Sequence, residues 1–390
     1  MGGMRQLLFA AALFGSSAIV SKAQDLEHLA SPSTSAESIL TAIPEYPNHI
    51  YVDARANFDD DIFVDNDGDG SRERPIRDLQ VAVNNASPDT TIHVTGDTRG
   101  NPYLSYTPTE SNYVFTELFI MNKRNLTILG PDPERASIGR PPLEEQNVPR
   151  FDNPYAYHPF LGGGTHFGIS DSQNIVITGF TIGSDSVGIL ISDSSDIMIC
   201  RNVFIDNQTD IESWYSYDLR VVNNTFSGWS NHRSAHKAED PDGMYTRQAM
   251  SFHFGDLPVE QRRAYIINNI IFYCPDPPIR FQEEDVPRWG EPLIRTGLDG
   301  MYIAFNDIQD VVVPWRVEYN SPYPFQRLIG SLSNWHNLSA RPAFMNPAQN
   351  DFRLATEPFV SPCIDAGTSD GVHPDGHTDI GAYECVDLQH

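Results

Sequence analysis

Three consecutive segments between residues 167 and 226 repeat one pattern of apolar side chains every 22 residues. The repeat aligns three columns: Ile175, Ile197 and Leu219; Ile177, Ile199 and Val221; and Ile182, Phe204 and Phe226. A fixed period of this length indicates stacked units, none of which buries its apolar face alone. Within each unit the apolar residues alternate as in a strand, and no helical period is present. The ladder therefore predicts an all-β solenoid, a parallel β-helix of short strands and polar corners.

The beginning of the chain has a different character. Arg5 precedes an apolar run over residues 7–20, and Ser21-Lys22-Ala23 offers small residues for cleavage. This order is typical of a secretory signal peptide. We therefore expect a signal peptide at 1–23, an N-terminal arm at 24–59 and a single β-helix domain at 60–390. The protein would then be secreted, periplasmic or on the cell surface.

The charge of the chain restricts its partners. The formal net charge is −26, and it becomes −28 when Arg5 and Lys22 are removed with the leader. Such an excess of acidic groups disfavours nucleic acid and anionic membranes as partners. No later apolar run is long enough to cross a bilayer, so we expect no membrane insertion. We also expect a monomer.

Four cysteines in an exported chain suggest disulfides. Cys363 and Cys385 are one 22-residue period apart. Adjacent coils lie about 4.8 Å apart, which is within reach of a disulfide, so this pair is expected to form one. Cys200 and Cys274 are expected to stay as buried thiols, with a disulfide as the alternative.

A short amphipathic helix is predicted over residues 75–86. Pro75 suits the first turn, and apolar residues recur at helical spacing: Ile76, Leu79, Val83 and Ala86. Because the open end of a solenoid must be covered, we expect this helix to cap the first coil. The first convincing strand is at 62–64, just before it.

After the ladder, two insertions at 228–263 and 276–298 interrupt the regular spacing. Strand patterns return at 265–272 and 301–308. Equivalent turns carry four asparagines: Asn202, Asn224, Asn269 and Asn306. We expect these side chains to hydrogen-bond to one another along the stack.

Two parts of the chain resemble a known superfamily. The stretch VDNDGDGS at 64–71, followed by Pro75 and a strand at Thr91, resembles the N-terminal cap of secreted right-handed parallel β-helix proteins. RPAFM at 341–345, DFRL at 351–354, SPCIDAG at 361–367 and DIGAYE at 379–384 are similar to the closing segment of that pectate-lyase-like superfamily. The resemblance covers most of residues 60–384 and implies a right-handed parallel β-helix.

The resemblance does not imply one activity. The superfamily includes polysaccharide lyases, glycoside hydrolases, uronate epimerases and non-catalytic surface proteins. Catalytic patterns of its better-known members are absent: Asp242 in Asp240-Pro241-Asp242 stands where alginate epimerases have histidine.

A candidate calcium site precedes the predicted helix. Asp65, Asp67, Asp69 and Gly70 match the first half of an EF-hand-type loop, in which alternate carboxylates converge. The twelfth position is Ile76, so backbone, water or Glu73 would have to complete the shell. A solvated turn is the alternative, and a bound calcium ion would be structural.

The first insertion is the main candidate for chemistry. Lys and Arg residues are enriched in residues 228–263 relative to the whole chain, which has 52 Asp and Glu residues but only 26 Lys and Arg residues. Long loops in compact domains are often functional, although a solvated loop is the alternative. We predict catalytic roles for five residues: Lys237 or His236 as base, Tyr245 as acid, and Arg220 and Arg247 as carboxylate clamps.

Strand alternation predicts a substrate-binding face beside this insertion. If Ile197 points inward, then Met198 and Arg220 point outward, and their column continues to Tyr265 and Tyr302. The same alternation turns Glu212 and Trp214 outward on another strand. Aromatic faces cover sugar C–H surfaces and arginine pairs with carboxylates. The predicted substrate-binding residues are Trp214, Tyr265, Tyr302, Arg233 and Trp289, and packing under the loops is the alternative for the two tyrosines.

These features favour a polysaccharide lyase that cleaves a uronic-acid-containing glycan. Such β-elimination needs a neutralised substrate carboxylate, a base for the C5 proton and an acid for the leaving oxygen. A glycoside hydrolase using Asp240, Asp242 or Glu212, and a non-catalytic carbohydrate-binding protein, are the alternatives.

Overall fold

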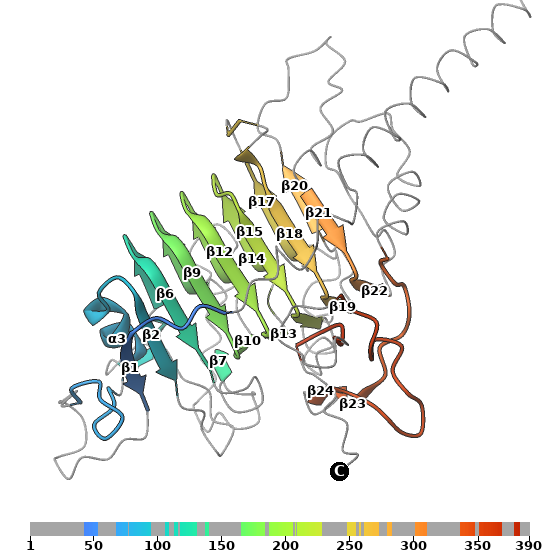
Figure 1. Cartoon of the computed structure of the whole chain (residues 1–390), viewed down its shortest axis with the longest axis horizontal. Helices are drawn as coiled ribbons and strands as arrows, with labels where there is room; N and C mark the ends of the chain where they lie inside the picture. The colour runs from blue at the N-terminus through green and yellow to red at the C-terminus, as the bar shows by residue number, and fades with distance from the viewer. Residues whose placement is uncertain are drawn as a thin grey trace, which may run out of the picture.

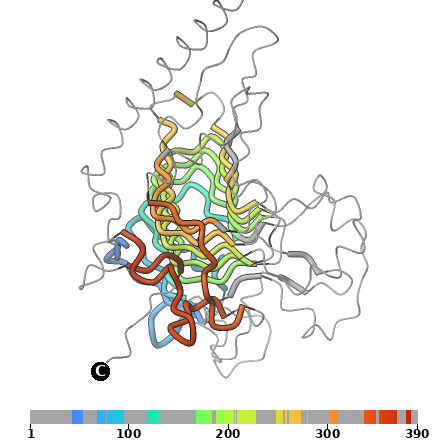
Figure 2. Tube along the Cα trace, turned by 90° about the vertical axis from the view of Figure 1, so that its right-hand side faces the viewer, coloured from blue at the N-terminus to red at the C-terminus, as the bar shows by residue number. Residues whose placement is uncertain are grey.

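The structure is a computed structural model that describes residues 43–53, 68–76, 78–94, 106–108, 113–115, 118–130, 137–139, 165–183, 187–205, 207, 209–227, 248–254, 257–258, 261–272, 279–282, 301–309, 336–347, 351–368 and 378–382. These residues build the right-handed parallel β-helix that the ladder and the resemblance predict, in which three parallel sheets run along one stack of coils (Figure 1). Seen along the stack, successive coils lie nearly on top of one another (Figure 2).

Sheet 1 has eight strands, all paired in parallel. In spatial order they are β1 (Asn48–Val52), β2 (Thr90–Val94), β6 (Arg124–Leu129), β9 (Gln173–Thr178), β12 (Ser195–Cys200), β15 (Leu219–Val222), β18 (Ala264–Ile267) and β21 (Met301–Ala304). The first described strand, β1, lies within the predicted arm and pairs with β2. This strand is not among those predicted, and the strand expected at 62–64 lies outside the described residues.

Sheets 2 and 3 have six parallel strands each. Sheet 2 contains β7 (Ser137–Gly139), β10 (Thr181–Gly183), β13 (Val203–Ile205), β16 (Thr225–Ser227), β19 (Ile270–Phe272) and β22 (Asp307–Gln309). Sheet 3 contains β5 (Leu118–Met121), β8 (Thr165–Ser170), β11 (Val187–Ser192), β14 (Thr209–Trp214), β17 (Gln248–His253) and β20 (Ile279–Gln282). Two antiparallel hairpins are formed by β3 (Tyr106–Pro108) with β4 (Tyr113–Phe115), and by β23 (Phe344–Asn346) with β24 (Asp351–Leu354).

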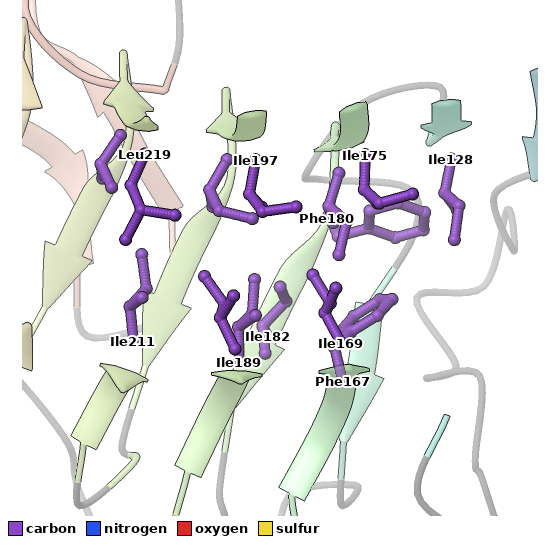
Figure 3. Packing of buried hydrophobic residues seen from close by; sticks show 14 of the residues in the cluster. Ile128, Phe167, Ile169, Ile175, Phe180, Ile182, Ile189, Ile197, Ile211 and Leu219 are labelled. Atoms are coloured by element: carbon purple, nitrogen blue, oxygen red, sulfur yellow. The ribbon is translucent and has the colours of Figure 1, made fainter. Parts of the chain in front are cut away.

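The 22-residue repeat sets the register of the stack. Ile175 is the Cα partner of Ile197, and Phe204 is the partner of both Ile182 and Phe226. The inward columns fill the centre of the coils, where isoleucines from successive turns lie above one another (Figure 3). The rings of Phe204 and Phe226 stack with centroids 4.8 Å apart. The predicted core columns are therefore confirmed.

Stacked asparagine side chains hydrogen-bond from coil to coil at one corner of the solenoid. The backbone N–H of Asn224 donates to Oδ1 of Asn269 at 2.9 Å, and the same bond links Asn202 to Asn224 and Asn269 to Asn306. Asn337 extends the predicted ladder by one step. All of these amide bonds run from one coil to the next, so the asparagines are structural, as expected.

Helix α3 (Leu79–Asn85) covers the first coil. The carboxylate of Asp78 accepts hydrogen bonds from the N–H groups of Gln80 and Val81, which makes it the N-cap and starts the helix later than Pro75. Leu79 and Val83 are buried against the core. The helix lies at the β1 end of the stack (Figure 1), and the predicted cap is confirmed.

The closing segment packs on the outer face of sheet 2. Cys363 and Ile380 join Ile270 and Phe272 in one buried cluster. Cys363 is a free thiol that donates to Oδ2 of Asp307 at 3.1 Å, so the predicted disulfide to Cys385 is not formed here. Burial, together with Asp307, raises the pKa of the Cys363 thiol, which keeps it protonated and unreactive. Cys385 and Cys274 lie outside the described residues.

Candidate functional site

Four side chains meet on the outer face of sheet 3. Glu212 and Trp214 come from β14, and Ser251 and His253 from β17. The register pairs Glu212 with Ser251 and Trp214 with His253. Because alternate residues of a strand share a face, all four lie on the side away from the core, while Ile211 and Met250 point inward. We call this group the β14–β17 cluster.

The imidazole of His253 is the centre of this cluster. Its Nε2 lies 3.1 Å from Oγ of Ser251 and 3.6 Å from Oε1 of Glu212. The His253 side chain is 5% exposed and that of Glu212 is 24% exposed. A histidine that faces a carboxylate and a hydroxyl can accept and release a proton, as general acid–base chemistry requires.

Trp214 gives the cluster an aromatic surface. Its ring lies parallel to that of His253, with centroids 3.7 Å apart and planes 7° from parallel. Its indole N–H donates to Oε1 of Glu212 at 3.0 Å. The indole is half-buried, and Tyr215 follows with its ring centroid 6.3 Å away. Aromatic rings of this kind bind the apolar faces of sugars while polar neighbours bind hydroxyls.

The outward orientation predicted for Glu212 and Trp214 is confirmed, but their partners were missed. His253 was assigned to a long insertion at 228–263, whereas the structure places residues 248–253 in β17. The alternation of Met250 and Phe252 with Ser251 and His253 was the signal that could have identified this strand.

The outer face of sheet 1 contains the other predicted column. Arg220 pairs with Tyr265, and Tyr265 with Tyr302, as the alternation predicts. The buried Nε of Arg220 finds no hydrogen-bond partner among the described residues. Beside it, Asp218 and Arg263 form an ion pair of 2.6 Å.

This face is apolar around the arginine. Val176, Met198, Cys200, Val222 and Ile267 form a buried cluster, and both Tyr265 and Tyr302 pack against it. Burial raises the pKa of Tyr302. The contacts of the two tyrosines therefore match the packing alternative more closely than an open sugar-binding surface.

Most of the other predicted site residues lie outside the described part of the chain. These are Lys237, His236, Tyr245, Arg247, Arg233, Trp289, Asp65 and Asp67, together with Asp240 and Asp242. Asp69 is described: its Oδ1 accepts a hydrogen bond of 2.9 Å from the N–H of Ser71. Hydrogen bonds from the side chain and then the backbone of Ser71 lower the pKa of the Asp69 carboxyl. That geometry is a local turn, and calcium binding stays a prediction.

Among the described residues, one group of three or more His, Cys, Asp and Glu side chains converges closely enough to hold a metal ion. It consists of Glu45, His49 and His93, whose ligand atoms lie within 4.8 Å of one another. The group lies at the β1 end of sheet 1, far along the stack from the β14–β17 cluster (Figure 1). The group is not among the predicted sites, because Glu45 and His49 fall in the predicted arm.

A family model described as periplasmic copper-binding protein (NosD) matches residues 162–245, the part that contains the ladder. The Glu45–His49–His93 group lies outside this match, and no described group of metal ligands lies within it. A search of curated proteins gave no match.

Several solved structures with some similarity are polysaccharide lyases. A double variant of pectate lyase from Xanthomonas campestris is 14% identical, with 63% of this chain and 79% of that chain covered and a TM-score of 0.32. Pectate lyase Pel9A is 12% identical, with coverage of 90% and 98% and a TM-score of 0.33. A rhamnogalacturonan lyase is 10% identical, with coverage of 68% and 67% and a TM-score of 0.33. One fold hosts many chemistries at such identities, so activity follows from the residues of each site.

Proposed function

Since the chain is a right-handed parallel β-helix with an aromatic and ionisable cluster on one outer face, we propose that it acts on a polysaccharide at the β14–β17 cluster. We further propose that the substrate is a uronic-acid-containing glycan and that the reaction is β-elimination. The observation that carries this proposal is the contact of His253 with Trp214, Ser251 and Glu212.

Sugar binding is assigned to Trp214. Its half-buried indole offers a rigid apolar face, and the hydrogen bond to Glu212 fixes the orientation of that ring. A pyranose can pack its C–H groups on such a ring while its hydroxyls bond to carboxylates. Because the sheet continues along the stack, successive sugars of a chain would lie over successive strands.

Proton transfer is assigned to His253. In β-elimination a base removes the C5 proton of the uronate, and the acidity of that proton depends on neutralising the neighbouring carboxylate. Nε2 of His253 lies within 3.6 Å of both a hydroxyl and a carboxylate in this cluster. Lys237, His236, Tyr245, Arg247 and Arg220 remain proposed as bases, acid and clamps.

The single carboxylate in the cluster bears on the hydrolase alternative. Canonical glycosidases use a pair of carboxyl groups, about 5–10 Å apart, on either side of the bond they cleave. Among the described residues of the β14–β17 cluster, Glu212 is the one carboxylate. Asp240 and Asp242, the other carboxylates of the hydrolase alternative, lie outside the described residues, so the assay below separates the two mechanisms.

Export is part of the proposal. The signal-like leader supports it, and the matched family is described as periplasmic. The described part of the chain contains no helix that is long and apolar enough to span a membrane.

The test is an assay of the purified chain on a panel of uronic-acid polysaccharides, followed at 235 nm. We expect new absorbance from the unsaturated product, and we expect His253→Gln to lower kcat by about 10²–10⁴-fold. His336→Gln, an exposed histidine away from the cluster, is the matched control and should change nothing.

Other outcomes would point elsewhere. New reducing ends without absorbance would indicate a hydrolase, and glycan binding without either product would indicate a non-catalytic protein. Full activity of His253→Gln, combined with loss in Lys237→Ala, would move the base from the sheet to the first insertion.

A further inference from the structure

Two histidines meet on the outer face of sheet 1 at the β1 end. His49 is on β1 and His93 is on β2, where its Cα partner is Tyr51. Val52 is fully buried and Ile50 packs on the core, so the alternate residues His49 and Tyr51 take the outer side. Nδ1 of His49 lies 3.0 Å from Nε2 of His93.

A carboxylate from a third segment joins them. Residues 43–47 cross the front of sheet 1 before entering β1 (Figure 1). This crossing is anchored on both sides of Glu45: the carbonyl of Pro44 accepts from Oγ1 of Thr127, and the N–H of Tyr46 donates to Oγ1 of Thr91, both at 2.8 Å. The backbone at Glu45 is therefore held in place, and its carboxylate reaches the two imidazoles.

We propose that Glu45, His49 and His93 form a binding site for a divalent late first-row transition metal, with Zn²⁺ as the best fit. Zinc binds imidazole nitrogen at about 2.0–2.1 Å, so a tetrahedral ion holds two such nitrogens about 3.3 Å apart. The two histidine nitrogens are already at 3.0 Å. The separation of the two nitrogens is therefore within a few tenths of an ångström of that in a pair of zinc ligands.

The donor set selects the class of metal. Imidazole suits Zn²⁺, Cu²⁺ and Ni²⁺, whereas Ca²⁺ and Mg²⁺ take oxygen ligands. Three protein ligands leave a fourth position for water, as in many accessible zinc sites. Glu45 and His49 are exposed, which gives the ion an entry path.

The orientation of one ligand is supported by its neighbour. The ring of Tyr51 stacks on that of His93, with centroids 4.7 Å apart and planes 13° apart. Such contacts hold a ligand ring in position before the metal arrives. The bound ion would tie the segment before β1 to the first two strands of sheet 1.

The test is isothermal titration of the full chain with Zn²⁺ at pH 7.5, with thermal unfolding measured in parallel. We expect His49→Ala and Glu45→Gln to lose one equivalent of Zn²⁺ or to bind it at least tenfold more weakly than the wild type. Zinc should raise the Tm of the wild type, because a ligand that binds only the folded state stabilises it, and should raise the Tm of His49→Ala less. His336→Ala, which removes a ring stacked on Phe305, should bind Zn²⁺ with the wild-type stoichiometry and show the wild-type rise in Tm when zinc is added.

Two further results decide the matter. His49 is exposed, so His49→Ala tests the site without opening the core. Equal stoichiometry and equal Tm shifts in wild type, His49→Ala and Glu45→Gln would overturn the proposal and leave the contact as a histidine–histidine hydrogen bond. Displacement of the bound Zn²⁺ by millimolar Ca²⁺ would also overturn it, because the site would then prefer an ion that takes oxygen ligands.

Discussion

The indole of Trp214 lies flat against the imidazole of His253, with ring centroids 3.7 Å apart. The two residues are direct Cα partners on neighbouring strands of sheet 3. The stack limits rotation of the imidazole, so its Nε2 stays directed at Ser251 and Glu212. An aromatic surface and an ionisable group are thus combined in a single pair of adjacent coils.

Removing the indole tests this arrangement. We predict that Trp214→Ala weakens binding of the polysaccharide about tenfold, because stacked aromatic contacts are each worth about 0.5–1.5 kcal/mol beyond the area they bury. Trp214→Phe keeps a ring over His253 and should retain most of the affinity. Affinity electrophoresis in gels that contain the polysaccharide measures both, and equal mobility of Trp214→Ala and wild type would contradict the assignment.

The asparagine ladder makes a prediction about stability. The amide of Asn224 donates to the carbonyls of Ile199 and Val222 and accepts from the N–H of Asn202, all of them buried. Asn224→Ala leaves these groups short of partners, and each orphaned buried group costs about 1–3 kcal/mol. We expect a loss of about 3 kcal/mol or more in the free energy of unfolding, measured by urea denaturation.

The end of the same ladder supplies the control. Asn337 makes equivalent bonds to Asn306 and Ile303, but it is half-buried. Water can therefore replace part of what is lost, and Asn337→Ala should cost clearly less. Equal losses at both positions would mean that burial does not set the strength of the ladder.

The sequence predicted the inward columns well because one period of 22 residues and strict alternation specify them. Residues that face outward beyond an insertion were harder to place. The pairing of Trp214 with His253 depends on the register of β17, which follows a long insertion and which no spacing reveals. The disulfide prediction for Cys363 was wrong for a related reason. It assumed that Cys363 lies in a regular coil, whereas the closing segment around Cys363 packs on the outside of sheet 2.

The capping helix gives a local test of the fold. Oδ1 of Asp78 accepts both hydrogen bonds that cap the start of this helix, from the N–H groups of Gln80 and Val81. We expect Asp78→Ala to lower the free energy of unfolding by about 1 kcal/mol, whereas Asp78→Ser, which can accept the same bonds, should lose little. Urea titration of the three proteins measures this, and a loss of equal size in both variants would assign the effect to charge rather than to capping.

The buried carboxyl of Asp307 should make the free energy of unfolding fall as the pH rises. Burial raises the pKa of its carboxyl, although the N–H of Ala340 and the thiol of Cys363 both donate to it. A carboxyl whose pKa is higher in the folded state binds its proton more tightly there. Its contribution to stability is therefore greatest below the unfolded pKa of about 3.9 and is lost as the pH rises through the folded pKa.

Asp307→Asn should remove this loss. Relative to wild type, we expect the free energy of unfolding of the variant to improve as the pH rises from 4, on top of a constant cost for the weakened contact with Cys363.

Asp351 is the matched control of opposite sign, because hydrogen bonds from Arg353 lower its pKa. Asp351→Asn should thus be least stable relative to wild type at neutral pH and should approach wild type as the pH falls. Urea titrations from pH 3 to 8 compare the two, and a difference for Asp307→Asn that does not change with pH would show that this carboxyl is not the source of the pH dependence.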